Sequence, residues 1–239
     1  YKTEETLPAF AAKHLSHHFS VQMAWGSERE RHQIIGIDAL ADADALLVSV
    51  RRRALPTADL AIIRAFVDRG KPVIGIRTAN HAFSLRGKKP PEATSVWETF
   101  DGDVFGGNYT NHYGNSLQTS LSIAATRSGQ AILSATDARA IRPAGSLYKV
   151  APLAPGARVL VEGTVTGQPP EPVAWTFIRN DGGRSFYTSL GHADDFAQPE
   201  FESLLAAGIH WACGIEPHPL SEIKAQNKRY ASGSGKQRK

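Results

Sequence analysis

A short apolar run that ends abruptly in polar residues constrains the fold more than any other part of the sequence. Residues 72–76 (PVIGI) are continuously apolar, which is typical of a strand buried on both faces of a parallel sheet. Arg77, Thr78, Asn80 and His81 follow directly. Ligands bind at the carboxyl ends of strands in open α/β sheets, so these four side chains are candidate ligand-binding residues. The alternative is that they only form hydrogen bonds with neighbouring loops.

The segments before this strand alternate between helix and strand patterns. Residues 3–15 have the pattern of an amphipathic helix, 19–25 that of a strand, 45–50 that of a second buried strand followed by three arginines, and 60–67 that of a helix. This order predicts a parallel α/β sheet with right-handed crossovers. Because the rest of the chain alternates and no strand precedes the first helix, we expect an N-terminal strand, and any signal peptide, to lie outside this sequence.

The second half of the chain contains further strand patterns and a closing helix. Residues 87–115 are irregular and rich in Gly, Asn and aromatic residues. Strands are then predicted at 120–125, 147–150, 159–163, 173–178 and 185–190, with turn signals at 155–156 and 181–183 and a helix at 201–213. We therefore predict one domain over residues 1–215 and a basic, disordered tail over residues 216–239.

Charge and composition exclude several classes of protein. The formal net charge is +4, but residues 221–239 alone carry +5, so the body of the chain is close to neutral. With no basic face bearing interleaved aromatics, nucleic-acid binding is not expected. No apolar run approaches the roughly 20 residues that span a bilayer. Cys213 is the only cysteine, so no intrachain disulfide can form.

The order of these elements and several motifs resemble the ThuA-like (trehalose utilisation) family. The matching stretches are YKTEETLP at the start, SVRRRAL, GIRTANHAF, FGGNYTNHYGN, EPVAWT and GGRSFYTSLGHADDF. That family is related to the class I glutamine amidotransferases. The resemblance implies a flavodoxin-like open parallel sheet flanked by helices.

The comparison with glutamine amidotransferases also indicates which chemistry is lost. Where those enzymes place a cysteine nucleophile after the G-I of the strand, this chain has Arg77. A guanidinium is always protonated and cannot attack a carbonyl carbon. Cys213 lies on the predicted closing helix, where a buried, unreactive thiol is expected. We therefore predict that the protein is not a functional glutamine amidotransferase.

A histidine and an acid at the end of a late strand match the second amidotransferase motif in part. The strand at 185–190 is followed by Gly191, His192 and Asp194, which keeps the spacing of histidine and acid. A carboxylate two residues on can hold the tautomer of a histidine and raise its basicity. His192 is therefore the predicted general acid/base and Asp194 its partner. The alternative is that His192 caps the helix that follows.

The Gly-, Asn- and aromatic-rich loop over residues 106–115 contains the residue types that bind sugars. Aromatic faces stack on the C–H surfaces of sugars, and amides and imidazoles hydrogen-bond to hydroxyl groups. Asn108, Tyr109 and His112 are the candidates in this loop. Trp97 is a further candidate platform, with a packed tryptophan as the alternative.

Metal binding is a competing use of the same histidines. His81, His112 and His192 lie on three loops that the fold could bring together, and Asp194 or Asp195 could complete a site. No local spacing such as H-x-x-x-H supports it, so no cofactor is predicted and a divalent metal is the alternative. A flavin or nucleotide site is disfavoured because there is no G-x-G-x-x-G.

Two functions remain after these steps. The first is an enzyme, a hydrolase or isomerase, acting on a carbohydrate or carbohydrate-derived small molecule, with Arg77 holding an anionic or hydroxyl group of the ligand. The second is a non-catalytic sugar-binding or accessory domain that kept the scaffold after losing its nucleophile. The sequence does not determine the reaction type. A homo-oligomer is possible, and the location is either cytoplasmic or exported.

Overall fold

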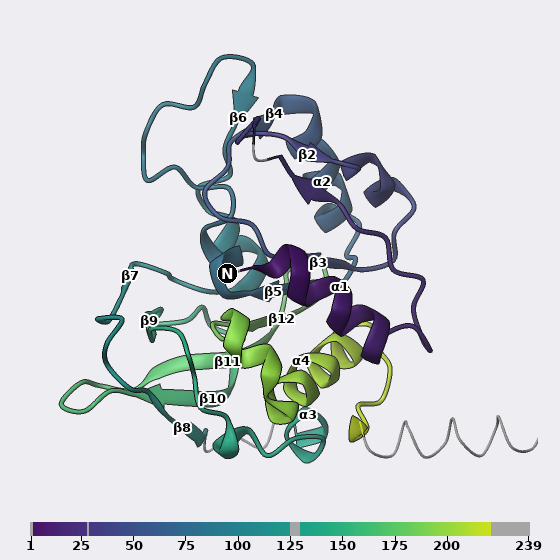
Figure 1. Cartoon of the computed structure of the whole chain (residues 1–239). Coiled ribbons are helices and arrows are strands. Elements are labelled where there is room, and N and C mark those ends of the chain that lie inside the picture. Colours follow the sequence, from purple (N-terminus) through teal and green to yellow (C-terminus); the bar gives the residue numbers. More distant parts are fainter. Residues whose placement is uncertain (1, 28, 125–129, 221–239) are drawn as a thin grey trace, which may run out of the picture.

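Six strands form the central sheet of the protein in the order β3, β5, β12, β11, β10, β8. The computed structural model describes residues 2–27, 29–124 and 130–220. The strands are β3 (Leu46–Val48), β5 (Val73–Ile76), β12 (Arg184–Thr188), β11 (Glu171–Ile178), β10 (Arg158–Thr164) and β8 (Ser120–Ile123). β3, β5 and β12 run parallel, and the remaining pairs are antiparallel. Figure 1 shows this mixed sheet with helices against it.

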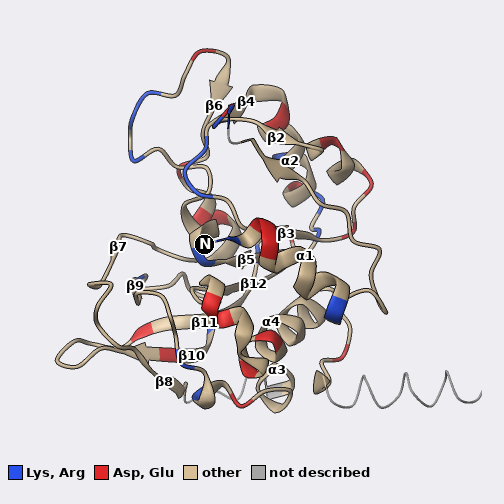
Figure 2. Cartoon of the chain, in the orientation of Figure 1, with Lys and Arg blue, Asp and Glu red and all other residues tan. Residues whose placement is uncertain are grey.

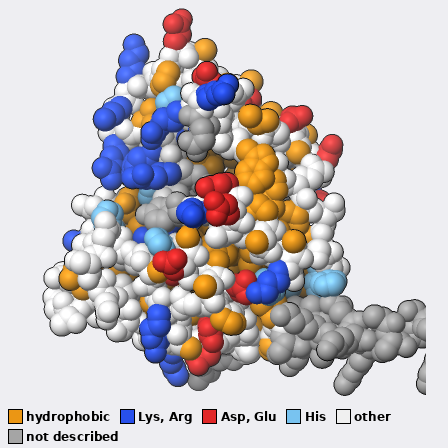
Figure 3. Space-filling model, in the orientation of Figure 1, with side chains coloured by type: hydrophobic (Ala, Val, Ile, Leu, Met, Phe, Trp, Pro, Cys, Tyr) orange, Lys and Arg blue, Asp and Glu red, His pale blue; other side chains and the backbone are white. Residues whose placement is uncertain are grey.

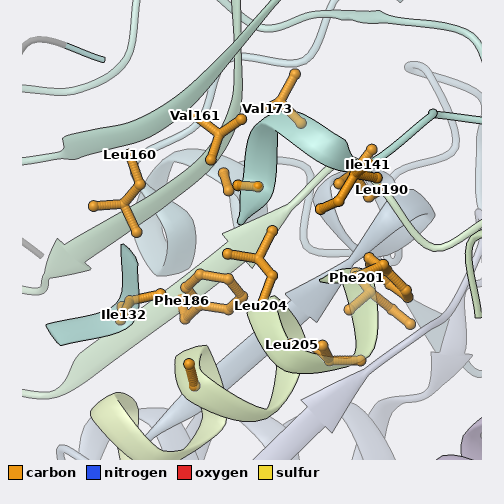
Figure 4. Packing of buried hydrophobic residues seen from close by; sticks show 14 of the residues in the cluster. Ile132, Ile141, Leu160, Val161, Val173, Phe186, Leu190, Phe201, Leu204 and Leu205 are labelled. Carbon is orange, nitrogen blue, oxygen red and sulfur yellow. The ribbon is translucent and has the colours of Figure 1, made fainter. Parts of the chain in front are cut away.

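Helices cover both faces of the sheet because successive strand residues point to opposite sides. Ile74 and Ile76 of β5 pack in one hydrophobic cluster with α1 (Thr3–His14), α3 (Gln130–Ser134) and α4 (Pro199–Ala212). Figure 4 shows α4 residues of this cluster against the strands. Val73 points the other way, toward α2 (Thr57–Asp68), the turn η1 (Ile37–Ala41) and the π-helical turn η3 (Asp101–Phe105).

Gly75 allows η3 to lie close to the sheet. A Cβ at this position would come within 2.5 Å of the ring of Phe105 and 2.8 Å of the ring of Tyr187. The glycine in the apolar run thus makes room for two buried aromatic rings. It brings Asp101, at the start of η3, near the carboxyl end of β5.

Short elements connect the main ones. Two-residue strands pair as β1 (Trp25–Gly26) with β2 (Ile34–Ile35), β4 (Leu55–Pro56) with β6 (Thr94–Ser95), and β7 (Asn111–His112) with β9 (Tyr148–Lys149). Besides η1, the 3₁₀ turns in the described residues are η2 (Arg77–His81), η4 (Ala138–Ala140) and η5 (Ala193–Ala197). η2 follows β5 directly, and η5 lies just beyond the end of β12.

The sequence predicted the α/β class correctly but not the direction of every strand. The parallel arrangement holds for β3, β5 and β12 only. The connections from β10 to β11 and from β11 to β12 are too short for a parallel crossover, which needs a dozen or more residues. These strands therefore form hairpins, and the expectation of a wholly parallel sheet is corrected.

A second correction concerns residues 19–25. The sequence predicts a strand there, but Trp25 is the only residue of this range in a strand, and its strand, β1, pairs with β2 rather than with the central sheet. Val21, Met23 and Trp25 are exposed. The predicted tail over residues 216–239 falls mostly outside the described residues, which end at 220. Among the described helices, none has the length and apolar character needed to cross a membrane.

Candidate functional site

A cleft of about 390 Å³ opens between η2, η3 and the loops around them, which we call the η2–η3 cleft. It lies beyond the carboxyl end of β5, where the sequence predicted a ligand site. Four of the predicted site residues line it, and ten further residues complete the wall. The four are Asn80, His81, Asn108 and Tyr109; the others are Arg52, Ser84, Arg86, Glu98, Thr99, Asp101, Gly102, Asp103, Gly107 and Thr110.

Asp101 is a buried carboxyl group in the wall of this cleft, and no motif in the sequence marks it as a site residue. The residue is 8% exposed. Oδ2 accepts a hydrogen bond from the backbone N–H of Tyr109 at 2.7 Å, while Oδ1 is buried without a partner among the described residues. Burial raises the pKa of Asp101 to about 7, and the Tyr109 hydrogen bond acts in the opposite direction. The carboxyl group can therefore both give and accept a proton near neutral pH.

The position of the Asp101 side chain depends on Gly107. A Cβ on residue 107 would collide with the Asp101 carboxyl group. The backbone N–H of Gly107 also donates to the carbonyl of Asp101 at 3.1 Å, closing the turn. The Gly-rich loop thus serves the site through space and backbone contacts as well as through Asn108 and Tyr109.

His81 presents a neutral imidazole to the cleft. Its Nδ1 lies 2.7 Å from Asn80 Oδ1, and because an amide oxygen can only accept, Nδ1 carries the hydrogen and Nε2 keeps its lone pair. Burial, followed by the charges of Arg52, Arg51 and other arginines, lowers the pKa of His81 to about 3. Its ring stacks on Tyr109 with centroids 4.4 Å apart. His81 is therefore a hydrogen-bond acceptor at neutral pH.

Asn80 shares a feature with Asp101. Its side chain is 4% exposed, and its Nδ2 is buried without a hydrogen-bond partner in the described chain. A buried amide donor that bonds to nothing carries a desolvation penalty of roughly 1–3 kcal/mol. The wall of the cleft therefore contains one buried donor and one buried acceptor that have no partner among the described residues.

Arg77 and Thr78 point into the protein instead of the cleft. Arg77 adopts a left-handed backbone conformation (φ 49°), and its Nη1 donates to the carbonyls of Ser146 at 2.9 Å and Ser189 at 2.7 Å. Its guanidinium also lies 4.4 Å from the centre of the Tyr148 ring. Thr78 is buried and does not line the cleft. Arg77 thus joins the strand ends to the loop before β9.

Tyr148 is the residue around which several predicted site residues gather. Besides Arg77, its ring neighbours those of His81, Tyr109 and His112, at 6.0, 4.9 and 6.4 Å between centroids. His112 is exposed, and its Nδ1 lies 2.7 Å from the Tyr113 carbonyl. Tyr148 lies within a predicted strand, and no signal in the sequence marked it as part of a site.

Trp97 and Cys213 take part in packing. The indole N–H of Trp97 donates to Asp103 Oδ2 at 2.7 Å, and the guanidinium of Arg64 lies 4.0 Å from the ring centre. Trp97 does not line the cleft. Cys213 is partly buried at the end of α4, and burial, with a smaller effect of Asp44, raises the pKa of its thiol to about 11. The thiol is thus protonated at neutral pH.

His192 lies after β12, in a segment that does not line the η2–η3 cleft. It is the N-cap of η5: its Nδ1 accepts from the backbone N–H of Asp194 at 3.3 Å and lies 3.5 Å from Asp194 Oδ2. Asp195 is fully buried and accepts from the backbone N–H groups of Gly191, His192 and Ala144 at 2.8–2.9 Å. The capping interaction is thus formed in the structure.

The three histidines considered for a metal lie in different surroundings. His81 is in the cleft wall, His112 is on β7, and His192 caps η5. The part of the chain that the structure describes contains no group of three or more His, Cys, Asp or Glu side chains arranged to hold a metal ion.

One family model matches most of the chain. The family model described as "ThuA: Trehalose utilisation" matches residues 2–212. Among solved structures, a ThuA-like protein from Bacteroides uniformis ATCC 8492 is 17% identical with a TM-score of 0.55, covering 74% of this chain and 71% of that one. A ThuA-like protein from Parabacteroides merdae ATCC 43184 is 18% identical with a TM-score of 0.55, covering 90% and 85%.

The same fold occurs under another description. The structure described as the mmIFT52 N-terminal domain is 14% identical with a TM-score of 0.51, covering 89% of this chain and 92% of that one. None of the curated proteins searched matches this sequence. At these identities the structural likenesses establish the fold alone.

Proposed function

The chain belongs to the ThuA family, described as trehalose utilisation, and we propose that it binds a carbohydrate or carbohydrate-derived molecule in the η2–η3 cleft and transfers a proton on it. One observation carries the proposal: Asn80 Nδ2 and Asp101 Oδ1 are buried in the cleft wall and have no partner in the described chain. A hydroxyl group is both a donor and an acceptor, so neighbouring hydroxyls of a sugar would satisfy both atoms.

Asp101 is the proposed acid/base in this cleft. A catalytic proton donor or acceptor works best when its pKa lies near the operating pH. Burial gives Asp101 a pKa of about 7, which meets that condition. Neutral His81 would accept a hydrogen bond from the ligand at Nε2, while its one N–H, at Nδ1, is held by Asn80 Oδ1. Tyr109, which is partly exposed and lines the cleft, is the aromatic ring that could contact a sugar C–H surface.

His192 and Asp194 form the alternative acid/base pair. Their side chains lie 3.5 Å apart, and His192 is only partly buried. A reaction at His192 would need a ligand bound beyond β12, outside the η2–η3 cleft. The two assignments therefore predict different sites for the same class of ligand.

A non-catalytic sugar-binding domain is the second candidate function. The observation that favours it is Arg77, which stands where related enzymes carry a nucleophile and whose guanidinium is bound to the carbonyls of Ser146 and Ser189. Such a domain would use the same Asn80 and Asp101 atoms for affinity alone. Binding without turnover would identify it.

The test is a panel of keto-sugars and disaccharides, screened by thermal shift and by product formation. A ligand that binds only the folded state raises the melting temperature. We expect a hit whose turnover falls about 10²–10⁴-fold in Asp101→Asn, the range for loss of a general acid/base. Asp103→Asn is the matched control, because Asp103 Oδ2 already accepts from Trp97 and Thr99. Full turnover by Asp101→Asn would refute the assignment.

A further inference from the structure

Two arginines line the η2–η3 cleft from different segments of the chain. Arg52 follows β3, and Arg86 lies in the loop after η2. Neither forms an ion pair with any residue that the structure describes. Figure 2 shows Lys and Arg positions along these segments near β4 and β6, and Figure 3 shows Lys and Arg side chains gathered on the same part of the surface.

The backbone holds both arginines at the cleft. The N–H groups of Arg52 and Arg53 donate to the carbonyls of His81 and Ala82 at 3.1 and 2.7 Å, which joins this segment to η2. The N–H of Arg86 donates to Ser84 Oγ at 3.3 Å. Both Arg52 and Arg86 have left-handed backbones, with φ 50° and 57°. This conformation costs of order 1–3 kcal/mol outside glycine and is found most often at functional sites.

The carboxylates in the cleft wall are engaged elsewhere. Glu98 accepts hydrogen bonds from the Ser84 hydroxyl and from the Leu85 N–H. Asp103 accepts from Trp97 and Thr99. Neither lies within ion-pair distance of Arg52 or Arg86. The Arg52 guanidinium donates to the Ser84 carbonyl at 3.5 Å, and neither guanidinium is paired with a carboxylate of the described chain.

The positive charge of these arginines lowers the pKa values of groups in the cleft wall. Burial is the largest cause of the lowered pKa of Arg52, and the charges of Arg86 and Arg51 follow. The charges of Arg52, Arg51 and Arg86 also rank directly after burial in lowering the pKa of His81. A cleft lined by one sign of charge attracts ligands of the opposite sign. Binding of an anion would relieve the repulsion among these cations.

Building on the proposed function, we propose that the substrate is an acidic carbohydrate derivative whose carboxylate or phosphate group is bound by Arg52 and Arg86. A guanidinium offers two parallel N–H donors to either group. The anion would sit at the arginine-lined side of the cleft, and the hydroxyls would face Asn80 and Asp101. The substrate class is thus a sugar acid or a sugar phosphate, and a neutral disaccharide would use only half of the site.

The experiment compares three matched probes: glucose, glucuronate and glucose 6-phosphate, with inorganic phosphate as a fourth. Binding is measured by calorimetry at 50 and 300 mM salt. For the wild-type protein we expect at least one acidic probe to bind about 10-fold or more tightly than glucose, with the difference shrinking at high salt. Preference for glucuronate alone would identify a sugar acid, and preference for glucose 6-phosphate alone a sugar phosphate.

Two variants locate the effect. Arg52→Gln and Arg86→Gln should each remove most of this preference, because the anionic group loses its partner. Arg158→Gln is the matched control, since Arg158 is exposed on β10 and does not line the cleft. Equal affinity for all three sugars, or a preference that survives both cleft variants, would overturn the inference.

The outcomes separate this inference from the proposed function. Sugar binding that depends on Asp101 but ignores charge would keep the function and reject the acidic substrate. Arginine-dependent binding of inorganic phosphate, with no contribution from any sugar, would support the anion site and reject the carbohydrate function.

Discussion

Two buried carboxyl groups near neighbouring strand ends of this protein differ in how completely they are hydrogen-bonded. β5 and β12 are parallel partners, so the segments that follow them begin at the same edge of the sheet. Near the end of β12, Asp195 accepts three backbone hydrogen bonds and is fully enclosed. Near the end of β5, Asp101 accepts one and leaves Oδ1 without a partner. A satisfied carboxylate supports the fold, whereas an unsatisfied one in a cleft indicates a ligand.

This difference explains why a sequence motif for catalysis and the better candidate for a binding site can lie in different places. The histidine–acid spacing after β12 resembles a catalytic pair, yet its local hydrogen bonds already account for His192 as a cap and Asp195 as the group that holds the turn. The polar residues after β5 are not explained in this way. Asn80 Nδ2 and Asp101 Oδ1 still need partners, so the cleft beside β5 is the better candidate for binding.

The largest expected effect comes from removing the satisfied carboxylate. Asp195→Ala would leave three backbone N–H groups without acceptors, and we expect the free energy of unfolding at pH 7 to fall by about 3 kcal/mol or more. Asp101→Asn should cost less than about 1 kcal/mol, because it replaces a poorly solvated carboxyl group with a neutral one. Urea denaturation measures both. A larger loss for Asp101→Asn would reverse the comparison.

The next expected effect is on the pH dependence of the stability, to which Asp101 and His81 contribute with opposite signs. The pKa of Asp101 is raised to about 7, so between pH 7 and 5 the folded protein gains a proton that the unfolded chain does not hold. Acidification over this range should therefore stabilise the fold through Asp101 by about 2 kcal/mol. The pKa of His81 is lowered to about 3, so between pH 7 and 5 this histidine binds a proton in the unfolded chain but stays neutral in the folded protein. His81 should destabilise the fold by about 2 kcal/mol over the same range.

These opposing contributions predict opposite changes in single variants. Compared with wild type, Asp101→Asn should lose stability on going from pH 7 to 5, and His81→Gln should gain it, each by about 2 kcal/mol. Urea denaturation at the two pH values measures the change. The double variant is the control, and its pH dependence should return close to that of the wild type. Changes of the same sign in both single variants would contradict the assignment.

Part of the polar turn predicted after the buried strand lies in the wall of the cleft. The apolar run at 72–76 correctly placed a buried strand, and two of the four polar residues after it, Asn80 and His81, line the cleft. Arg77 and Thr78 do not, because successive residues of a 3₁₀ turn point in different directions. The pattern of the run identifies the end of a strand but not which side chains of the following turn face outward.

Asp101 and the strand directions show what local pattern could not supply. The pKa and orientation of Asp101 depend on Gly107 and Tyr109 closing around it, a tertiary arrangement without a sequence motif. The antiparallel half of the sheet had a signal, because the turn at 181–183 leaves too little chain for a crossover. The strands were predicted, but this consequence of the short connection was not.

The smallest expected effect tests the comparison at His192 itself. His192→Ala removes the cap of η5 and should lower the free energy of unfolding by about 1 kcal/mol, while His192→Asn should keep most of it, since Asn is a favoured N-cap. Both variants lack the imidazole. If His192 acts only as a cap, both should retain turnover of any hit from the sugar panel within about 3-fold of wild type, which steady-state kinetics would measure. A stable His192→Asn protein with turnover reduced 100-fold or more would place the chemistry beyond β12 and leave the η2–η3 cleft with binding alone.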